Sequence, residues 1–192
     1  MGHVFDSSAF AKLDNPRRRE LLPPESILEG LGVTAGSRLA DFGCGTGYLA
    51  LPAATVVGTE GHVFAMDLQE RMLVEARRRS EAAGLCNIAW ILNPEGHIPL
   101  PGAFVDRLAM VAVFHEIRQR EEVLAEACRV LQPRGRIGIV DWTPGFTEMG
   151  PQEDHRVPAE TAAGLLEAAG FSHISIGAVS AGFYIVTGEK PA

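Results

Sequence analysis

Three closely spaced glycines follow a short apolar segment near the start of the chain. Residues 38–42 (Arg-Leu-Ala-Asp-Phe) have the composition of a buried strand, and glycines stand at positions 43, 45 and 47. Glycine lets the backbone turn tightly and approach a ligand closely, and the start of a following helix offers N–H groups that have no partner within the helix. This order of strand, turn and helix predicts an α/β fold that binds a nucleotide-like ligand.

The spacing of these glycines also bears on which ligand is bound. The dinucleotide fingerprint is Gly-x-Gly-x-x-Gly, and read from Gly43 it requires a small residue at position 48. The chain has Tyr48 there, and its third glycine comes one residue early. The spacing therefore argues against a nicotinamide dinucleotide.

Apolar segments alternate along the chain with segments of helical pattern, which predicts a Rossmann-like, mostly parallel sheet with helices on both faces. Glycines at positions 84 and 170 are typical of helix ends. Residues 180–182 are typical of a hairpin turn. The predicted strands are 38–42, 62–67, 88–92, 106–113, 135–141, 173–179 and 182–187, and the predicted helices are 17–31, 47–57, 69–83, 118–131 and 159–169.

Composition and charge are those of a single globular domain spanning residues 1–192. A net charge of −7 provides no general attraction to nucleic acid or to an anionic membrane. The arginine runs 17–19 and 77–79 are flanked by acidic residues, so each is interpreted as a solvated helix face. Three widely spaced cysteines form neither a disulfide framework nor a metal site, which favours the cytoplasm. No segment is apolar enough to span a bilayer.

At residues 41–47 the chain reads Asp-Phe-Gly-Cys-Gly-Thr-Gly, which resembles motif I of the class I S-adenosylmethionine (SAM)-dependent methyltransferases. The segment Asn93-Pro94-Glu95 is similar to the part of that family that lies beside adenine, although many relatives have aspartate first. Residues 129–136 resemble the turn that precedes the fifth strand. The likeness runs nearly end to end and is greatest to small enzymes of the ubiquinone/menaquinone C-methyltransferase type.

This resemblance implies the strand order 3-2-1-4-5-7-6, with the last strand antiparallel, and SAM as the cofactor, converted to S-adenosylhomocysteine. It places Asp67 at the ribose hydroxyls, because two carboxylate oxygens suit a vicinal diol. Asp41 would orient the glycine turn or the methionine amine, and Leu68 would pack on adenine. The complete set of expected cofactor residues is Asp41, Gly43, Cys44, Gly45, Gly47, Asp67, Leu68, Asn93, Pro94, Glu95, Val111 and Ala112.

Candidate acceptor-side residues lie outside these motifs. His115 and Glu116 follow the fourth strand, where a histidine can accept a proton near neutral pH. The side chains of adjacent residues in the first turn of a helix point in different directions, so we do not assume that His115 and Glu116 pair with each other. His155 and Arg156 lie in the long loop 142–158, where Arg156 would hold an anionic acceptor or form a surface ion pair. This loop and the N-terminal segment within 1–30 are the predicted lid.

Methyl transfer from a sulfonium needs alignment and exclusion of water more than catalytic groups. The sequence therefore predicts a methyltransferase that acts on a small-molecule acceptor and needs no metal. It also predicts that the protein forms a homodimer. A SAM-binding protein without transfer activity is one alternative. A nicotinamide-dependent oxidoreductase is another, although no Tyr-x-x-x-Lys pair supports it. The residues at 113–116 also lack the Asn/Asp-Pro-Pro-Tyr motif of adenine or glutamine methyltransferases.

Overall fold

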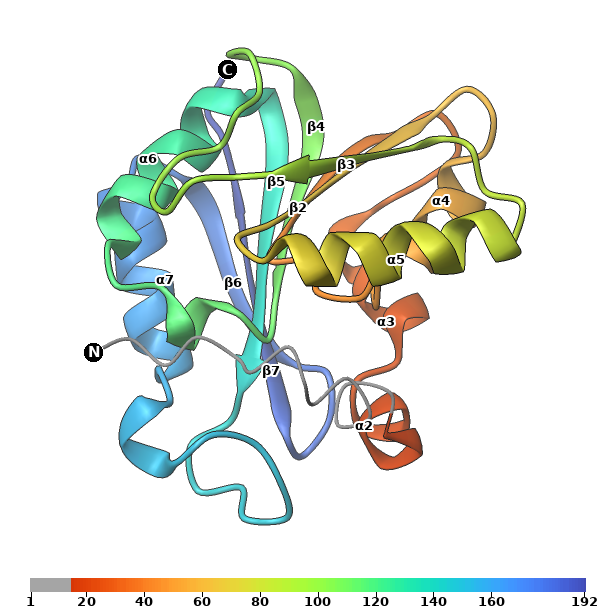
Figure 1. The fold of residues 1–192 in the computed structure, drawn as a ribbon. Coiled ribbons are helices and arrows are strands. Elements are labelled where there is room, and N and C mark those ends of the chain that lie inside the picture. The colour runs from red at the N-terminus through yellow and green to blue at the C-terminus, as the bar shows by residue number, and fades with distance from the viewer. Residues whose placement is uncertain (1–14) are drawn as a thin grey trace.

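The computed structural model describes residues 15–192, which form one sheet with helices on both of its faces (Figure 1). Its seven strands have the order β3-β2-β1-β4-β5-β7-β6, which confirms the predicted fold. The elements are α2 (Pro16–Leu21), α3 (Pro24–Leu31), β1 (Arg38–Phe42), α4 (Ala50–Val57), β2 (His62–Asp67), α5 (Glu70–Ala82), β3 (Ile88–Leu92), β4 (Val105–Val111), η2 (Phe114–Glu116), α6 (Arg120–Val130), β5 (Leu131–Trp142), η3 (Glu153–His155), α7 (Ala159–Ala168), β6 (Ser172–Ala178) and β7 (Phe183–Glu189).

The first five strands of the sheet run parallel, and the C-terminal hairpin supplies its antiparallel part. β1 is an inner strand, paired with β2 on one side and β4 on the other. β7 pairs antiparallel with both β5 and β6. The reversal of strand order beside β1 brings the carboxyl ends of β1, β2 and β4 together, which is where ligands bind in open α/β sheets.

The central strands are buried on both faces of the sheet, each face beneath a separate layer of helices. Leu39 packs with the apolar side chains of α3 and α4, whereas Ala40 and Phe42 pack with those of α6 and α7. Figure 1 shows α4 and α5 on one side of the sheet and α6 and α7 on the other. Burial on both faces explains why the central strands are almost continuously apolar rather than alternating.

The predicted single helix over 17–31 is wrong, because the structure has two helices there, α2 and α3. The break falls at Pro23 and Pro24, since proline lacks the N–H that a helix interior requires and restricts the residue before it. Pro24 instead occupies the first position of α3. α2 therefore ends at Leu21, and one of its residues, Arg18, lies at the ligand-binding end of the sheet.

The strand predicted at 135–141 begins earlier, at Leu131. Leu131 pairs with Val105 of β4, and the register shifts before Arg107 pairs with Arg136. This irregularity accommodates the segment Gln132–Gly135 within a continuous strand, where the sequence pattern suggested a turn. The other strands and helices end within a few residues of their predicted limits.

The described residues include only part of the predicted lid. Its N-terminal portion lies outside the described residues except for 15–30, which contribute α2 and most of α3. The loop after β5 is present and contains the short helix η3. Among residues 15–192, no helix has both the length and the apolar character needed to cross a membrane.

Candidate functional site

A cavity opens where β1, β2 and β4 end, at the position expected for a ligand. The glycine turn after β1 forms its floor, Asp67 and Asn93 stand along one side, and the end of β4 and η2 form another. Ten of the twelve predicted cofactor residues line it, as does Glu116. The ten are Asp41, Gly43, Cys44, Gly45, Asp67, Leu68, Asn93, Glu95, Val111 and Ala112.

The glycine turn leaves no room for a side chain at Gly43. Gly43 has φ +73°, and a Cβ built on it would lie 2.4 Å from Cγ2 of Val113. The N–H groups of Gly43 and Cys44 both donate to the Met66 carbonyl, which ties the turn to β2. Ala112, at the end of β4, also has a positive φ of 52°. Such strained positions cluster where backbone must lie close to a ligand.

Asp67 links the end of β2 to the glycine turn. Its Oδ2 accepts from the Gly45 N–H at 2.9 Å, and its Oδ1 accepts from the Gln69 N–H at 2.9 Å. Burial raises the pKa of this carboxyl, and the hydrogen bonds from Gln69, Gly45 and Leu68 oppose that rise. The two oxygens are thus oriented by backbone while the side chain still faces the cavity.

Asp41 carries a second carboxyl at the floor of the cavity. It is buried, and none of the described residues donates a hydrogen bond to its Oδ2. Burial raises the pKa of Asp41 to about 7, with a further contribution from the negative charge of Asp67. A buried acceptor without a partner is costly. A cationic or N–H-bearing ligand in the cavity would remove that cost.

Asn93 and Leu68 line the cavity where β3 and β2 end. Asn93 is buried, and its Oδ1 also receives no hydrogen bond from residues 15–192. Its N–H donates to the Asp67 carbonyl at 3.2 Å, which places it directly beside β2. Leu68 is 46% exposed although it is large and apolar. Together they offer a hydrogen-bond acceptor next to an apolar surface.

Two predicted cofactor residues do not line the cavity. Gly47 lies behind the turn, where a Cβ would be 3.1 Å from Cγ of Leu51. The carbonyl of Pro94 accepts from Nδ2 of Asn93 at 3.3 Å, so it supports Asn93 from outside. The buried Cys44 lines the cavity with a thiol whose pKa is raised by burial, as expected of a packing residue rather than a nucleophile.

Arg18 is a lining residue that the sequence interpretation missed. Its side chain is buried, and the guanidinium lies 4.7 Å from the ring centroid of Tyr48. The Tyr48 hydroxyl donates to the Leu22 carbonyl, which anchors the ring beneath α2. The interpretation of 17–19 as a solvated face therefore holds for Arg17 and Arg19 but is wrong for Arg18, because the break at Pro23 turns α2 toward the cavity.

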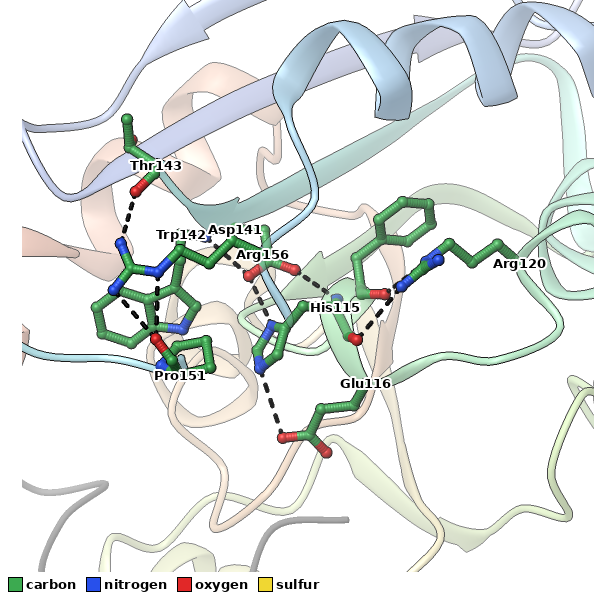
Figure 2. Close-up of polar contacts among 9 residues, drawn as sticks. His115, Glu116, Arg120, Asp141, Trp142, Thr143, Pro151 and Arg156 are labelled. Carbon is green, nitrogen blue, oxygen red and sulfur yellow. Dashed lines mark hydrogen bonds and ion pairs between the residues drawn. The ribbon is translucent and has the colours of Figure 1, made fainter. Parts of the chain in front are cut away.

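His115 lies between two carboxylates beside the cavity (Figure 2). Its Nδ1 is 2.8 Å from Oδ1 of Asp141, and its Nε2 is 3.7 Å from Oε1 of Glu116. His115 and Glu116 do approach each other, because η2 is a single tight turn. Asp141 was not predicted as a site residue, although a polar residue near the end of a buried strand was a usable signal. No cluster of three or more His, Cys, Asp or Glu side chains in residues 15–192 is arranged to hold a metal ion.

His155 and Arg156 lie in the loop after β5 and do not line the cavity. The Arg156 side chain is only 5% exposed, and its guanidinium donates to the carbonyls of Thr143 and Pro151 (Figure 2). It also donates to the Met149 carbonyl at 3.1 Å. These contacts hold the loop together. They favour a structural role for Arg156 over the binding of an anionic acceptor.

A glycine turn at the end of β1, facing an acidic side chain at the end of β2, defines a Rossmann-like site for a nucleoside-containing cofactor. Comparison with known proteins narrows this class. The model of the methyltransferase domain family matches residues 39–135, about half of the chain. A solved SAM-dependent methyltransferase from Aquifex aeolicus has a TM-score of 0.92 and 31% identity, covering 97% of this chain and 100% of that one. The chain belongs to the SAM-dependent methyltransferase family, as its motifs predicted.

Curated relatives are similar over a shorter region. A ubiquinone/menaquinone biosynthesis C-methyltransferase of Roseobacter denitrificans is 31% identical over 62% of this chain and 48% of its own length. A demethylmenaquinone methyltransferase of Tropheryma whipplei is 35% identical over 59% of this chain and 45% of its own. The chain spans about half the length of the curated relatives it matches.

Proposed function

We propose that this protein transfers the methyl group of SAM to a small-molecule acceptor. The observation that carries the proposal is the Asp67 carboxylate, which faces the same cavity as the glycine turn and is hydrogen-bonded to it. Bound SAM supplies a methyl group on a positively charged sulfur, which makes that methyl an electrophile. The chain itself has to bind SAM, align the acceptor and exclude water.

The nucleoside end of the cofactor fits the side of the cavity formed by β2 and β3. Asp67 presents two oriented oxygens, one for each hydroxyl of a ribose diol. The Oδ1 of Asn93 is a buried acceptor that suits the exocyclic amine of adenine, and the exposed side chain of Leu68 suits its ring face. The Asn93 side-chain amide can therefore make the adenine contact that an aspartate at this position makes in many relatives.

The amino-acid end of the cofactor fits the floor of the cavity and α2. Arg18 provides a buried cation for a carboxylate, and Asp41 provides a carboxylate for an ammonium or a sulfonium. The two opposite charges match a zwitterion. The methyl group would then face η2, where Glu116 lines the cavity and His115 stands beside it.

The remaining parts of the proposal rest on the sequence and the relatives. The acceptor is a small molecule taken from the cytoplasm rather than a nucleic acid, consistent with a net charge of −7. The names of the curated relatives make aromatic quinone precursors the first acceptors to assay. His155 stays a predicted acceptor contact, and a homodimer stays a predicted assembly.

Isothermal titration with SAM and S-adenosylhomocysteine tests the cofactor site. Asp67→Asn should weaken binding about 10- to 100-fold, because hydrogen bonds to a charged group are worth about 1.5–3 kcal/mol. Asp106→Asn is the matched control, since its Oδ2 also accepts a backbone N–H, from Arg38 at 2.8 Å, but lies outside the cavity. Absence of SAM binding by the wild-type protein, or equal affinity in both variants, would contradict the proposal.

A further inference from the structure

We propose that His115 is the base that removes a proton from a hydroxyl group of the acceptor, and that Asp141 is its positioning residue. The inference rests on the proposed methyl transfer and adds to it the chemistry of the acceptor. It places the reacting hydroxyl next to Nε2 of His115, beside the carboxylate of Glu116.

The hydrogen bonds of Asp141 define which imidazole nitrogen is available. Asp141 is 1% exposed, and its carboxylate accepts from the N–H groups of His115 and Trp142, each at 2.8 Å. Its Oδ1 also lies 2.8 Å from Nδ1 of His115. An ionised carboxylate can only accept, so Nδ1 must carry the hydrogen in this contact. In the neutral imidazole, Nε2 then carries the lone pair.

The surroundings of η2 hold the imidazole in place. Arg120 donates to the carbonyls of Phe114 and His115, at 3.2 and 3.3 Å, and so fixes the backbone of η2 (Figure 2). Asp141 holds that backbone from the opposite side through the His115 N–H. These contacts from Arg120 and Asp141 fix the backbone of η2 and so restrict the orientation of the His115 imidazole.

Nε2 of His115 approaches a residue that lines the cavity, although His115 itself is not a lining residue. This nitrogen lies 3.7 Å from Oε1 of Glu116, whose side chain lines the cavity together with Val113 and Ile117. The charged or titratable groups around His115 come from several elements: Glu116 on η2, Arg120 on α6 and Asp141 on β5. Tyr184 on β7 faces Asp141. The two carboxylates flanking the ring stabilise the imidazolium that proton transfer creates.

The chemistry of methyl transfer determines which acceptors need this base. A neutral amine attacks with its own lone pair and can lose a proton to water afterwards, whereas a neutral hydroxyl is a weak nucleophile until its proton leaves. In the proposed step the hydroxyl proton passes to Nε2. The oxygen forms a bond to the methyl carbon, and the S–CH3 bond breaks with its electron pair left on sulfur. The imidazolium then releases the proton to water.

Nuclear magnetic resonance of the ¹⁵N-labelled protein tests the positioning role without an acceptor. The His115 resonances of the wild type should show a hydrogen on Nδ1 in the neutral form, both with and without S-adenosylhomocysteine. Asp141→Asn should shift the ring toward the Nε2–H form, because the amide can donate to Nδ1. The exposed His173 provides the reference resonance. A wild-type ring protonated on Nε2 would overturn the assignment.

Methyl transfer tests the acceptor class. Phenols, naphthols and primary alcohols are compared with anilines and amines of the same skeleton, with mass detection of the product. Methylation should require a hydroxyl, and His115→Gln should reduce kcat at least about 100-fold with little change in SAM affinity. The wild-type kcat should rise with pH through one ionisation that His115→Gln abolishes and His173→Gln retains. Asp141→Glu should recover more activity than Asp141→Asn.

The outcomes separate this inference from the function it rests on. Loss of SAM binding in the wild type overturns the proposed methyl transfer itself. SAM binding with methylation of amines only, or of no hydroxyl compound in the panel, overturns the acceptor class. Hydroxyl methylation with an unchanged pH profile in His115→Gln overturns the role of His115. If Asp141→Asn does not fold, the wild-type tautomer and the His115→Gln profile decide the question.

Discussion

The backbone of Gly43 faces the side chain of Val113 so closely that one methyl group would not fit between them. A Cβ on Gly43 would lie 2.4 Å from Cγ2 of Val113, and φ at Gly43 is +73°. The contact joins the turn after β1 to the residue two positions past the end of β4. These two segments form adjacent walls of the cavity, so their separation determines its shape.

Gly43→Ala should therefore lower both stability and cofactor affinity. The unfavourable φ and the overpacked methyl group together should reduce the free energy of unfolding by about 2–4 kcal/mol. Gly36→Ala is the matched control, because Gly36 has φ +84° but a Cβ there would meet no atom within 4 Å. Urea denaturation of the two variants measures the difference. Equal losses would mean that Val113 moves aside without cost.

Arg18→Gln should weaken the binding of S-adenosylhomocysteine about 10- to 100-fold, because the charge-assisted contact between Arg18 and the carboxylate of the ligand's amino-acid part is lost. Binding of methylthioadenosine, which lacks the amino-acid part, should change little. Arg17→Gln is the neighbouring control, since the Arg17 side chain is 48% exposed and pairs with Glu20 and Glu148. Calorimetry with the two ligands measures the effect. Equal weakening for both ligands would place Arg18 elsewhere than at the carboxylate.

Asp41→Asn should stabilise the ligand-free protein at alkaline pH. Burial raises the pKa of Asp41 from 3.8 to about 7, so the folded state holds its proton more tightly than the unfolded state. The stability contributed by that proton is present at low pH and is lost as pH rises toward 7. The variant should thus exceed the wild type in free energy of unfolding at pH 8, by on the order of 4 kcal/mol. The two proteins should converge near pH 4 in denaturation curves.

The same substitution should weaken SAM binding, because an ionised Asp41 attracts the positive charge of the cofactor. Wild-type affinity should rise as pH increases through about 7, and the affinity of Asp41→Asn should vary less. Calorimetric titrations between pH 6 and pH 8 compare the two proteins. A parallel pH dependence in wild type and variant would assign the effect to another group.

Arg156→Met should loosen the loop after β5 without affecting the cofactor. The guanidinium donates to three carbonyls of that loop while its side chain is 5% exposed. We expect a loss of about 2 kcal/mol or more in stability and faster proteolysis within residues 143–155. Arg77→Met, on the exposed face of α5, serves as the control. Unchanged proteolysis, with a lost response to anionic acceptors instead, would restore the acceptor-binding interpretation.

The cofactor side of the molecule was largely predictable because its determinants are local. β1, β2 and β3 have the predicted limits at both ends, since each is a short apolar segment bounded by turns or charged residues. The glycine turn and Asp67 are fixed by adjacent sequence, so their meeting at one edge follows from parallel pairing of β1 and β2.

The remaining site residues depend on contacts between distant segments. Asp141 meets His115 because β5 pairs with β4 in one particular register, and residue spacing alone does not specify that register. Arg18 reaches the cavity because two helices replace one, for which the signal was the Pro23-Pro24 pair. Arg156 was expected to hold an anionic acceptor or to form a surface ion pair, because the sequence does not show the carbonyl partners of a charged residue in a loop.

The hydrogen bonds of Asp67 have a consequence for molecular recognition. The carboxylate is already oriented by the N–H groups of Gly45 and Gln69, so a ligand does not have to immobilise a flexible side chain on arrival. The Asp67 side chain loses its rotational freedom once, during folding, so later binding events do not incur that entropic cost again. Glutamate at this position would retain the charge and lose this advantage, because its longer side chain cannot accept from the same two N–H groups in the same geometry.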